Sequence, residues 1–221
     1  MPGEKIILLP MSYLGPLQLY CRFFEKGKVL IEQNDNYQKQ TYRSRCDIYS
    51  ANGRLSLIIP VKHKRGQRMK VKETQIDYST DWRRLHWKGI VSAYNSSPYF
   101  EYYRDTFELY YQKEYRYLID LCMRLNDDVL KIIGISHKPE VSGAFVFPGE
   151  NPKIVDLREI IHPKKRIEMD ERFMIVQYTQ VFLNKHGFIP NLSILDLIFN
   201  MGPESGSILN SSLKKPQVNP L

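Results

Sequence analysis

Short apolar runs and turn residues in the first third of the chain predict a strand–helix–strand unit. Residues 5 to 10 hold four consecutive aliphatic side chains before a proline, which is typical of a buried strand. Apolar positions from 17 to 25 then recur at helical spacing and stop at a glycine, and residues 29 to 31 form a second apolar run. Two strands joined by a helix within about 30 residues are expected to run parallel. The pattern therefore predicts an α/β protein, with a mixed and mostly parallel sheet that starts from this βαβ unit.

A hairpin is predicted directly after this unit. Residues 45 to 49 and 55 to 61 are strand-like and flank Asn52-Gly53, a dipeptide that favours the tight turns of hairpins. We expect the resulting antiparallel pair to join the same sheet.

The middle and C-terminal parts are predicted to be mainly helical. Apolar residues recur every three or four positions, with breaks at Ser97-Pro98 and Gly134, and this periodicity predicts five helices. They are expected over residues 82 to 94, 99 to 112, 115 to 133, 173 to 184 and 192 to 200. A short strand over 141 to 147 and a loop over 148 to 171 lie between them. The pattern predicts a single domain over residues 1 to 204 and a flexible tail, rich in Ser, Asn, Pro and Lys, over 205 to 221.

Composition narrows the class of partner. A net charge of +8 and a pI near 9.3 favour anionic ligands such as phosphates, nucleotide sugars or nucleic acid. The longest apolar runs are strand-sized and no secretory leader is evident, so we expect no transmembrane segment and a cytoplasmic location. The three scattered cysteines and the absence of common nucleotide, hydrolase and zinc motifs predict neither a metal site nor a cofactor. The oligomeric state is left open.

Basic residues after the second predicted strand suggest an anion clamp. Lys39, Arg43 and Arg45 lie where ligands bind in α/β folds, and Lys62 opens a basic run over residues 62 to 72. Guanidinium groups match phosphate geometry, so these side chains are predicted to bind an anionic small molecule. The alternative is a solvated basic edge that resists aggregation.

The helix over 82 to 94 offers a candidate acid or base. Trp82 and His86 lie one turn apart on the same face, and an imidazole titrates in the range that proton transfer needs. His86 is therefore a candidate catalytic residue and Trp82 a candidate wall of the substrate pocket. A lone histidine on an apolar face is also typical of a core position.

A second polar group marks the last predicted helix. Asn191 and Ser193 precede it, and Asp196 and Asn200 lie four residues apart on one face. Asp196 is predicted as a catalytic carboxylate, and the other three as substrate-binding residues. The alternative is that they tie the helix to its loops.

Five collinear segments stand out along the chain: LLPMSYLGPLQLY (8 to 20), IEQNDNYQKQTYRSRC (31 to 46), IPVKHKRG (59 to 66), WRRLHWKGIVSAYNSSPYFEYYRD (82 to 105) and IPNLSILDLIFNMG (189 to 202). Together they resemble the WbqC-like family of bacterial surface-polysaccharide clusters. The resemblance implies a role in O-antigen synthesis, for which transfer of an aminoacyl group such as glycine to a sugar has been suggested. The family's polar positions correspond here to Lys39, Arg45, Lys62, His86, Asn191, Ser193, Asp196 and Asn200.

One departure from the family pattern affects the expected chemistry. Leu8-Leu9-Pro10 stands where many members have His-Gln-Pro, so this chain lacks any acid or base that the histidine provides there. The leading hypothesis is a transferase acting on a nucleotide- or lipid-linked sugar. The alternatives are a non-enzymatic binding or scaffold protein of an envelope-synthesis complex and, less favoured, a nucleic-acid-binding module, because many tyrosines fall in periodic helices rather than on an exposed basic face.

Overall fold

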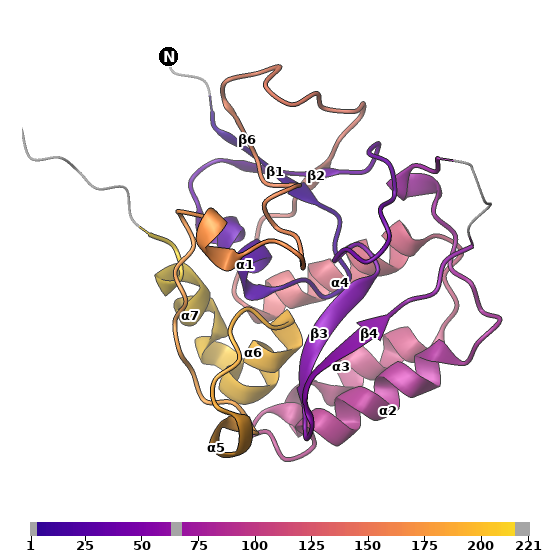
Figure 1. Cartoon of the computed structure of the whole chain (residues 1–221), viewed down its shortest axis with the longest axis vertical. Helices are drawn as coiled ribbons and strands as arrows, with labels where there is room; N and C mark the ends of the chain where they lie inside the picture. The colour runs from indigo at the N-terminus through magenta and orange to yellow at the C-terminus, as the bar shows by residue number, and fades with distance from the viewer. Residues whose placement is uncertain (1–3, 63–67, 215–221) are drawn as a thin grey trace, which may run out of the picture.

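The computed structural model describes residues 4–62 and 68–214. It contains a four-stranded parallel sheet (Figure 1). The strands are β1 (Ile6–Pro10), β2 (Lys28–Glu32), β5 (Glu140–Val141) and β6 (Ile154–Asp156), in the order β5-β2-β1-β6. All three pairings are parallel. The helix α1 (Leu17–Tyr20) and a 3-10 turn (Cys21–Phe24) connect β1 to β2. The predicted βαβ unit and the mostly parallel α/β class are confirmed.

The hairpin forms as predicted but does not join this sheet. Strands β3 (Arg45–Ser50) and β4 (Gly53–Ile58) pair antiparallel as a separate two-stranded sheet. Gly53 has φ +92°, a conformation that favours glycine, which explains the turn at Asn52-Gly53. The expectation of one sheet is wrong because β5 pairs with β2 and β6 pairs with β1, which leaves the hairpin to pack elsewhere.

Six further helices lie in the middle and C-terminal parts of the described chain. They are α2 (Trp82–Tyr94), α3 (Phe100–Gln112), α4 (Leu118–Ile132), α5 (Leu183–His186), α6 (Ile194–Met201) and α7 (Ser205–Ser211). The predictions for α2, α3, α4 and α6 agree with these bounds to within three residues. Shorter 3-10 turns occur at Val71–Glu73, Ile167–Met169 and Gly202–Glu204.

Three predictions for the last third of the chain are wrong. The segment predicted as a helix over 173 to 184 is mostly irregular, since the Met174 amide donates to the Ser212 carbonyl at 2.8 Å and only α5 is helical. The predicted strand over 141 to 147 is reduced to β5, and the predicted loop over 148 to 171 contains β6. Long-range partners decide each of these cases.

The expected flexible tail also differs from the structure. Residues 205 to 211 form helix α7, in which Leu209 is fully buried, and Gly206 lies so close to the Ile133 carbonyl that an added Cβ would be 2.4 Å from it. Burial of Leu209 stabilises a segment whose polar composition suggested disorder. The rest of the predicted tail, residues 215–221, lies outside the described residues.

The two faces of the parallel sheet are covered differently. Ile7, Leu9, Val29 and Ile31 point into the main core. On the other face Leu8 is buried, but Ile6, Leu30 and Ile154 are only half-buried, and the irregular segment between β5 and β6 lies over them. In Figure 1 this segment lies on the side of the strands away from α4 and α6. Parallel sheets usually have helices on both faces, so this covering is unusual and leaves a hollow of about 710 Å³.

Candidate functional site

His86, a predicted catalytic residue, lies in the core. It is 5% exposed, and its Nδ1 lies 3.1 Å from the Tyr13 hydroxyl while its Nε2 lies 3.2 Å from the Ile58 carbonyl oxygen. Tyr13 in turn bonds the Tyr111 hydroxyl at 2.6 Å. Burial lowers the pKa of His86 to about 4, although the Ile58 carbonyl opposes the shift. The imidazole is therefore neutral near pH 7 and has protein partners on both nitrogens.

Asp196, the other predicted catalytic residue, belongs to a different buried group. Its carboxylate is fully buried and accepts bonds from the Tyr94 hydroxyl at 2.9 Å, the Tyr178 hydroxyl at 2.6 Å and the Gln180 amide at 2.8 Å. Burial raises the pKa of Asp196 to about 6, while these three donors lower it in part. Among the described residues, His86 and Asp196 share no hydrogen-bond partner.

The basic residues of the predicted anion clamp do not converge on one site either, because Arg43 and Arg45 pair with different carboxylates. Arg43 is 2% exposed and pairs with Asp35 at 2.5 Å, and no described residue accepts a hydrogen bond from its buried Nε. Arg45 instead makes two bonds to Asp47, at 2.9 and 3.2 Å. Lys39 and Lys62 are exposed. Residues 63–67 of the basic run that begins at Lys62 lie outside the described residues.

The remaining predicted substrate-binding residues contact the protein itself. Trp82 is 4% exposed and lies edge-on to His86, with ring centres 5.1 Å apart. The part of the chain that the structure describes offers no acceptor to its indole nitrogen. Asn191 accepts from the Gln18 amide at 2.9 Å, and the Ser193 hydroxyl donates to the Leu14 carbonyl at 2.7 Å. Asn200 donates to the Asp196 carbonyl at 2.7 Å. These contacts fit the alternative of helix-to-loop ties, and their role in binding stays a prediction.

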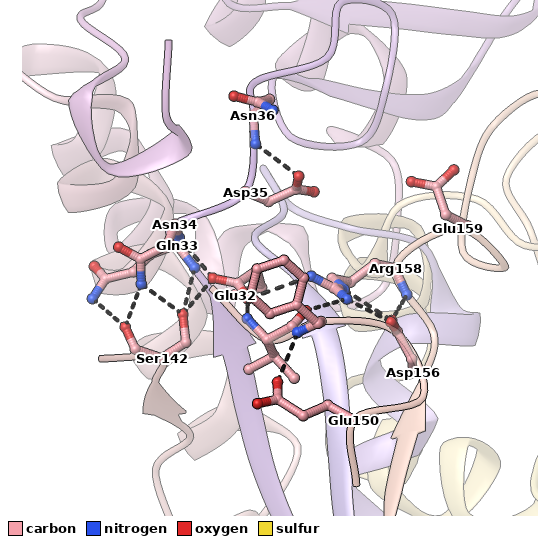
Figure 2. A network of polar contacts seen from close by, with 12 residues as sticks. Glu32, Gln33, Asn34, Asp35, Asn36, Ser142, Glu150, Asp156, Arg158 and Glu159 are labelled. Atoms are coloured by element: carbon pink, nitrogen blue, oxygen red, sulfur yellow. Dashed lines mark hydrogen bonds and ion pairs between the residues drawn. The ribbon is translucent and has the colours of Figure 1, made fainter. Parts of the chain in front are cut away.

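A polar network that the sequence predictions missed lies at the carboxyl ends of the parallel strands (Figure 2). We call Glu32, Asn34, Ser142, Asp156 and Arg158 the carboxyl-edge network. Figure 2 shows Glu32 at its centre, with Ser142 on one side and Arg158 on the other. In open α/β sheets ligands bind beyond the carboxyl ends of the strands, where the strand order reverses. Here the chain runs from β1 to β2 and β5 and then returns to β6 on the other side of β1, so the reversal lies at β1.

Glu32 and Arg158 form the buried part of this network. The Glu32 carboxylate has no exposed side-chain surface and accepts from the Asn34 amide at 2.7 Å, the Val146 amide at 2.9 Å and the Arg158 guanidinium at 3.4 Å. The Ser142 hydroxyl also donates to it. Arg158 is 5% exposed. The network therefore fixes the segment after β5 to the end of β2.

Asp156 completes the network at its accessible side. Arg158 donates to its two carboxylate oxygens at 2.9 and 2.6 Å. Burial alone would raise the pKa of Asp156, but the bonds from Arg158 outweigh burial and lower it. The Asp156 side chain remains 26% exposed and accepts three bonds, where a carboxylate has about four acceptor sites. It is thus an ionised acceptor with room for one more donor.

Cationic groups lie on the loops around this edge. The segment that carries Lys39 is joined to the segment that carries Lys70, since the Tyr37 amide donates to the Met69 carbonyl at 2.8 Å. Lys70 is exposed, as Lys39 is. The Gln38 side-chain amide donates to Glu159 at 3.3 Å, which joins the loop of Lys39 to the segment after β6. This edge therefore combines exposed cations with an accessible carboxylate.

The residues of the network left a weak signal in the sequence. Glu32 ends a short apolar strand, and Asp156 ends the run Ile154-Val155, so each is a carboxylate at the end of a strand. The second run is too short to be recognised without its partner β1. Leu8, which stands where many family members have the histidine of His-Gln-Pro, pairs in register with Asp156 and so lies next to this network. Among the described residues, no group of three or more His, Cys, Asp and Glu side chains is arranged to hold a metal ion.

Comparisons with known proteins identify a family and a relative of this chain. The model of the WbqC-like protein family matches residues 12–171, which is most of the chain and includes every member of the carboxyl-edge network. The chain belongs to the WbqC-like protein family. This WbqC-like chain is also 26% identical over 226 residues to a Mycobacterium tuberculosis protein, "Uncharacterized protein Rv1507c", with 93% of this chain and 97% of the relative covered. No solved structure matches it. No helix among the described residues has the length and apolar character needed to cross a membrane.

Proposed function

We propose that this WbqC-like protein is a transferase of surface-polysaccharide synthesis that binds a phosphate-bearing sugar at the carboxyl edge of its parallel sheet. The observation that carries the proposal is the carboxyl-edge network, in which charged groups on β2 and just after β6 flank the strand where the order reverses. Family membership supports the link to surface polysaccharides. The suggested reaction of the family, transfer of an aminoacyl group such as glycine to a nucleotide- or lipid-linked sugar, is the reaction we assign.

Individual groups at this edge have chemistry suited to such a ligand. Within residues 4–62 and 68–214, Asp156 has an acceptor position left for a sugar hydroxyl, and the buried Nε–H of Arg43 lacks an acceptor. The exposed ammonium groups of Lys39 and Lys70 would balance phosphate charge. His86, Asp196 and Arg45 have their own protein partners elsewhere, so the proposal assigns them no contact with the sugar, and their earlier predicted roles stay untested.

Ligand binding tests the proposal directly. The full chain is titrated with a panel of UDP- and dTDP-linked sugars, and thermal unfolding is followed. A true ligand at a hundredfold excess over its dissociation constant stabilises by about 2.7 kcal/mol. The double variant Lys39→Ala/Asp156→Asn is expected to weaken binding at least tenfold. The control Lys88→Ala/Lys113→Ala removes exposed lysines elsewhere and should bind like the unmodified chain.

Turnover separates the transferase from its alternative. Mass spectrometry of the sugar after incubation with aminoacyl donors is expected to show added aminoacyl mass. Tight sugar binding without any product would favour the non-enzymatic binding or scaffold protein, in agreement with Leu8-Leu9 replacing a histidine of the family. No stabilisation by any sugar, together with equal behaviour of both double variants, would remove the proposed site.

A further inference from the structure

A second cavity lies at the opposite edge of the parallel sheet. It is bounded by the turn before β2, the segment 172–174 and the end of α7, and its volume is about 1080 Å³. Lys5, which lines it, directly precedes β1, and Glu25 and Lys26 lie between the 3-10 turn and β2. The cavity is thus at the amino ends of the strands, whereas the carboxyl-edge network is at their other ends. We call it the amino-edge cavity.

Positive charge exceeds negative charge around this cavity. Glu25, with a side chain only 4% exposed, pairs with Lys5 at 2.9 Å, with Arg22 at 2.6 Å and with Arg172. Arg22 also pairs with the buried Asp170. Arg22 and Asp170 do not line the cavity, so the members of this ion-pair cluster that line it are Lys5, Glu25 and Arg172.

Two further lysines add to this excess. Lys26 and Lys214 line the cavity and are exposed, and neither forms an ion pair with any described residue. The neighbouring acidic residues Glu4 and Glu171 are exposed and do not line the cavity. The lining thus holds four cations, Lys5, Lys26, Arg172 and Lys214, and one carboxylate, Glu25. This excess of positive charge favours an anionic occupant of the cavity.

The wall of the cavity is partly apolar. Phe24, Met174 and Leu213 line it, and Met174 is 44% exposed. Two backbone hydrogen bonds hold the segment 172–174 against the end of α7. The Met174 amide donates to the Ser212 carbonyl at 2.8 Å, and the Lys214 amide donates to the Arg172 carbonyl at 3.0 Å. A cavity with an apolar wall and a cationic rim matches a ligand that has both an apolar chain and an anionic group.

We propose that the amino-edge cavity binds an amphipathic phosphate monoester, with the phosphate held by Lys26 and Lys214 and the alkyl chain against Phe24, Met174 and Leu213. This goes beyond the proposed sugar site, since it uses none of the same residues. Inorganic phosphate lacks the chain, and a neutral amphiphile lacks the charge. Each is therefore expected to bind more weakly than a ligand that combines the two.

Calorimetric titration of the full chain with hexyl, octyl and decyl phosphate, kept below their aggregation concentrations, tests the proposal. Affinity is expected to rise about fourfold per methylene, as about 0.8 kcal/mol per buried CH₂ implies. Lys26→Glu/Lys214→Glu should lower the affinity for decyl phosphate at least tenfold. The control Lys88→Glu/Lys113→Glu changes the net charge equally and should have no effect.

Other outcomes would overturn the proposal. Equal affinity for inorganic phosphate and decyl phosphate would exclude the apolar contact, and equal affinity for decyl maltoside would exclude the phosphate contact. Co-sedimentation with phosphatidic acid vesicles but no binding of monomeric decyl phosphate would indicate attraction to a charged surface instead. Lys39→Ala/Asp156→Asn should leave decyl phosphate binding intact, so failure here is distinguishable from failure of the sugar site.

Discussion

Protonation of the buried Asp196 is expected to control a measurable part of the stability of this protein. Its pKa is raised to about 6, whereas in the unfolded chain an aspartate titrates near 3.9. Between these values the native state holds a proton that the unfolded state has released. The free energy of unfolding should therefore fall as pH rises from about 4 to about 6, by about 3 kcal/mol for a shift of about two pKa units.

A comparison of the unmodified chain with Asp196→Asn isolates this effect. The amide has nearly the same size and does not titrate, so any cost of its contacts with Tyr178 and Gln180 is independent of pH. His86 has the opposite effect, because its pKa of about 4 means that the native state resists a proton that the unfolded chain accepts. His86 is present in both proteins, and its contribution cancels in the difference.

Urea unfolding, followed by the fluorescence of Trp82 and Trp87, provides the measurement at closely spaced pH values. From pH 4.5 to 7, the stability of the unmodified chain relative to Asp196→Asn should fall by about 2 kcal/mol. A difference that stays constant, or that rises with pH, would show that Asp196 is ionised throughout and would refute the reasoning from burial.

Two further predictions concern the sheet edge and a helix end. Replacing Arg158 with Met leaves Glu32 buried without its cation, which should lower the free energy of unfolding in urea by about 3 to 5 kcal/mol. Hydrogen exchange at the Val146 amide, which donates to Glu32, should become faster. Unchanged exchange would mean that the network does not hold that segment. Gly202 has φ +52°, and a Cβ added by Gly202→Ala would lie 2.4 Å from the Tyr99 ring. The melting temperature of this variant should therefore fall further than that of Gly53→Ala, where nothing lies within 4 Å of the added Cβ. Equal losses would contradict the steric argument.

The parts of the fold that depend on near neighbours were predictable from the sequence. Helix α2 has the predicted bounds, and the turn at Gly53 and the parallel pair of β1 and β2 also formed as expected. Helical periodicity, a turn dipeptide and a short crossover each involve residues close together along the chain, so the signal is complete within one window of sequence.

The candidate site was predictable only in part. The sequence places basic residues in the loop after β2, and Arg43 lies there, paired with Asp35, at the edge of the sheet where ligands bind in α/β folds. The structure does not bring the two predicted catalytic residues together, because His86 contacts Tyr13 while Asp196 accepts from Tyr94 and Tyr178. A polar residue on a helix face gives no information about which distant side chain satisfies it.

The sequence by itself determined the class of fold, most of the helices and the excess of positive charge. Only the tertiary structure decided that β6 pairs with β1, that Glu32 meets Arg158 across 126 positions, and that α7 is ordered. The physical reason is that a three-residue strand or a polar helix is too weak to form alone, and becomes stable only when a partner far along the chain supplies its hydrogen bonds and its buried surface.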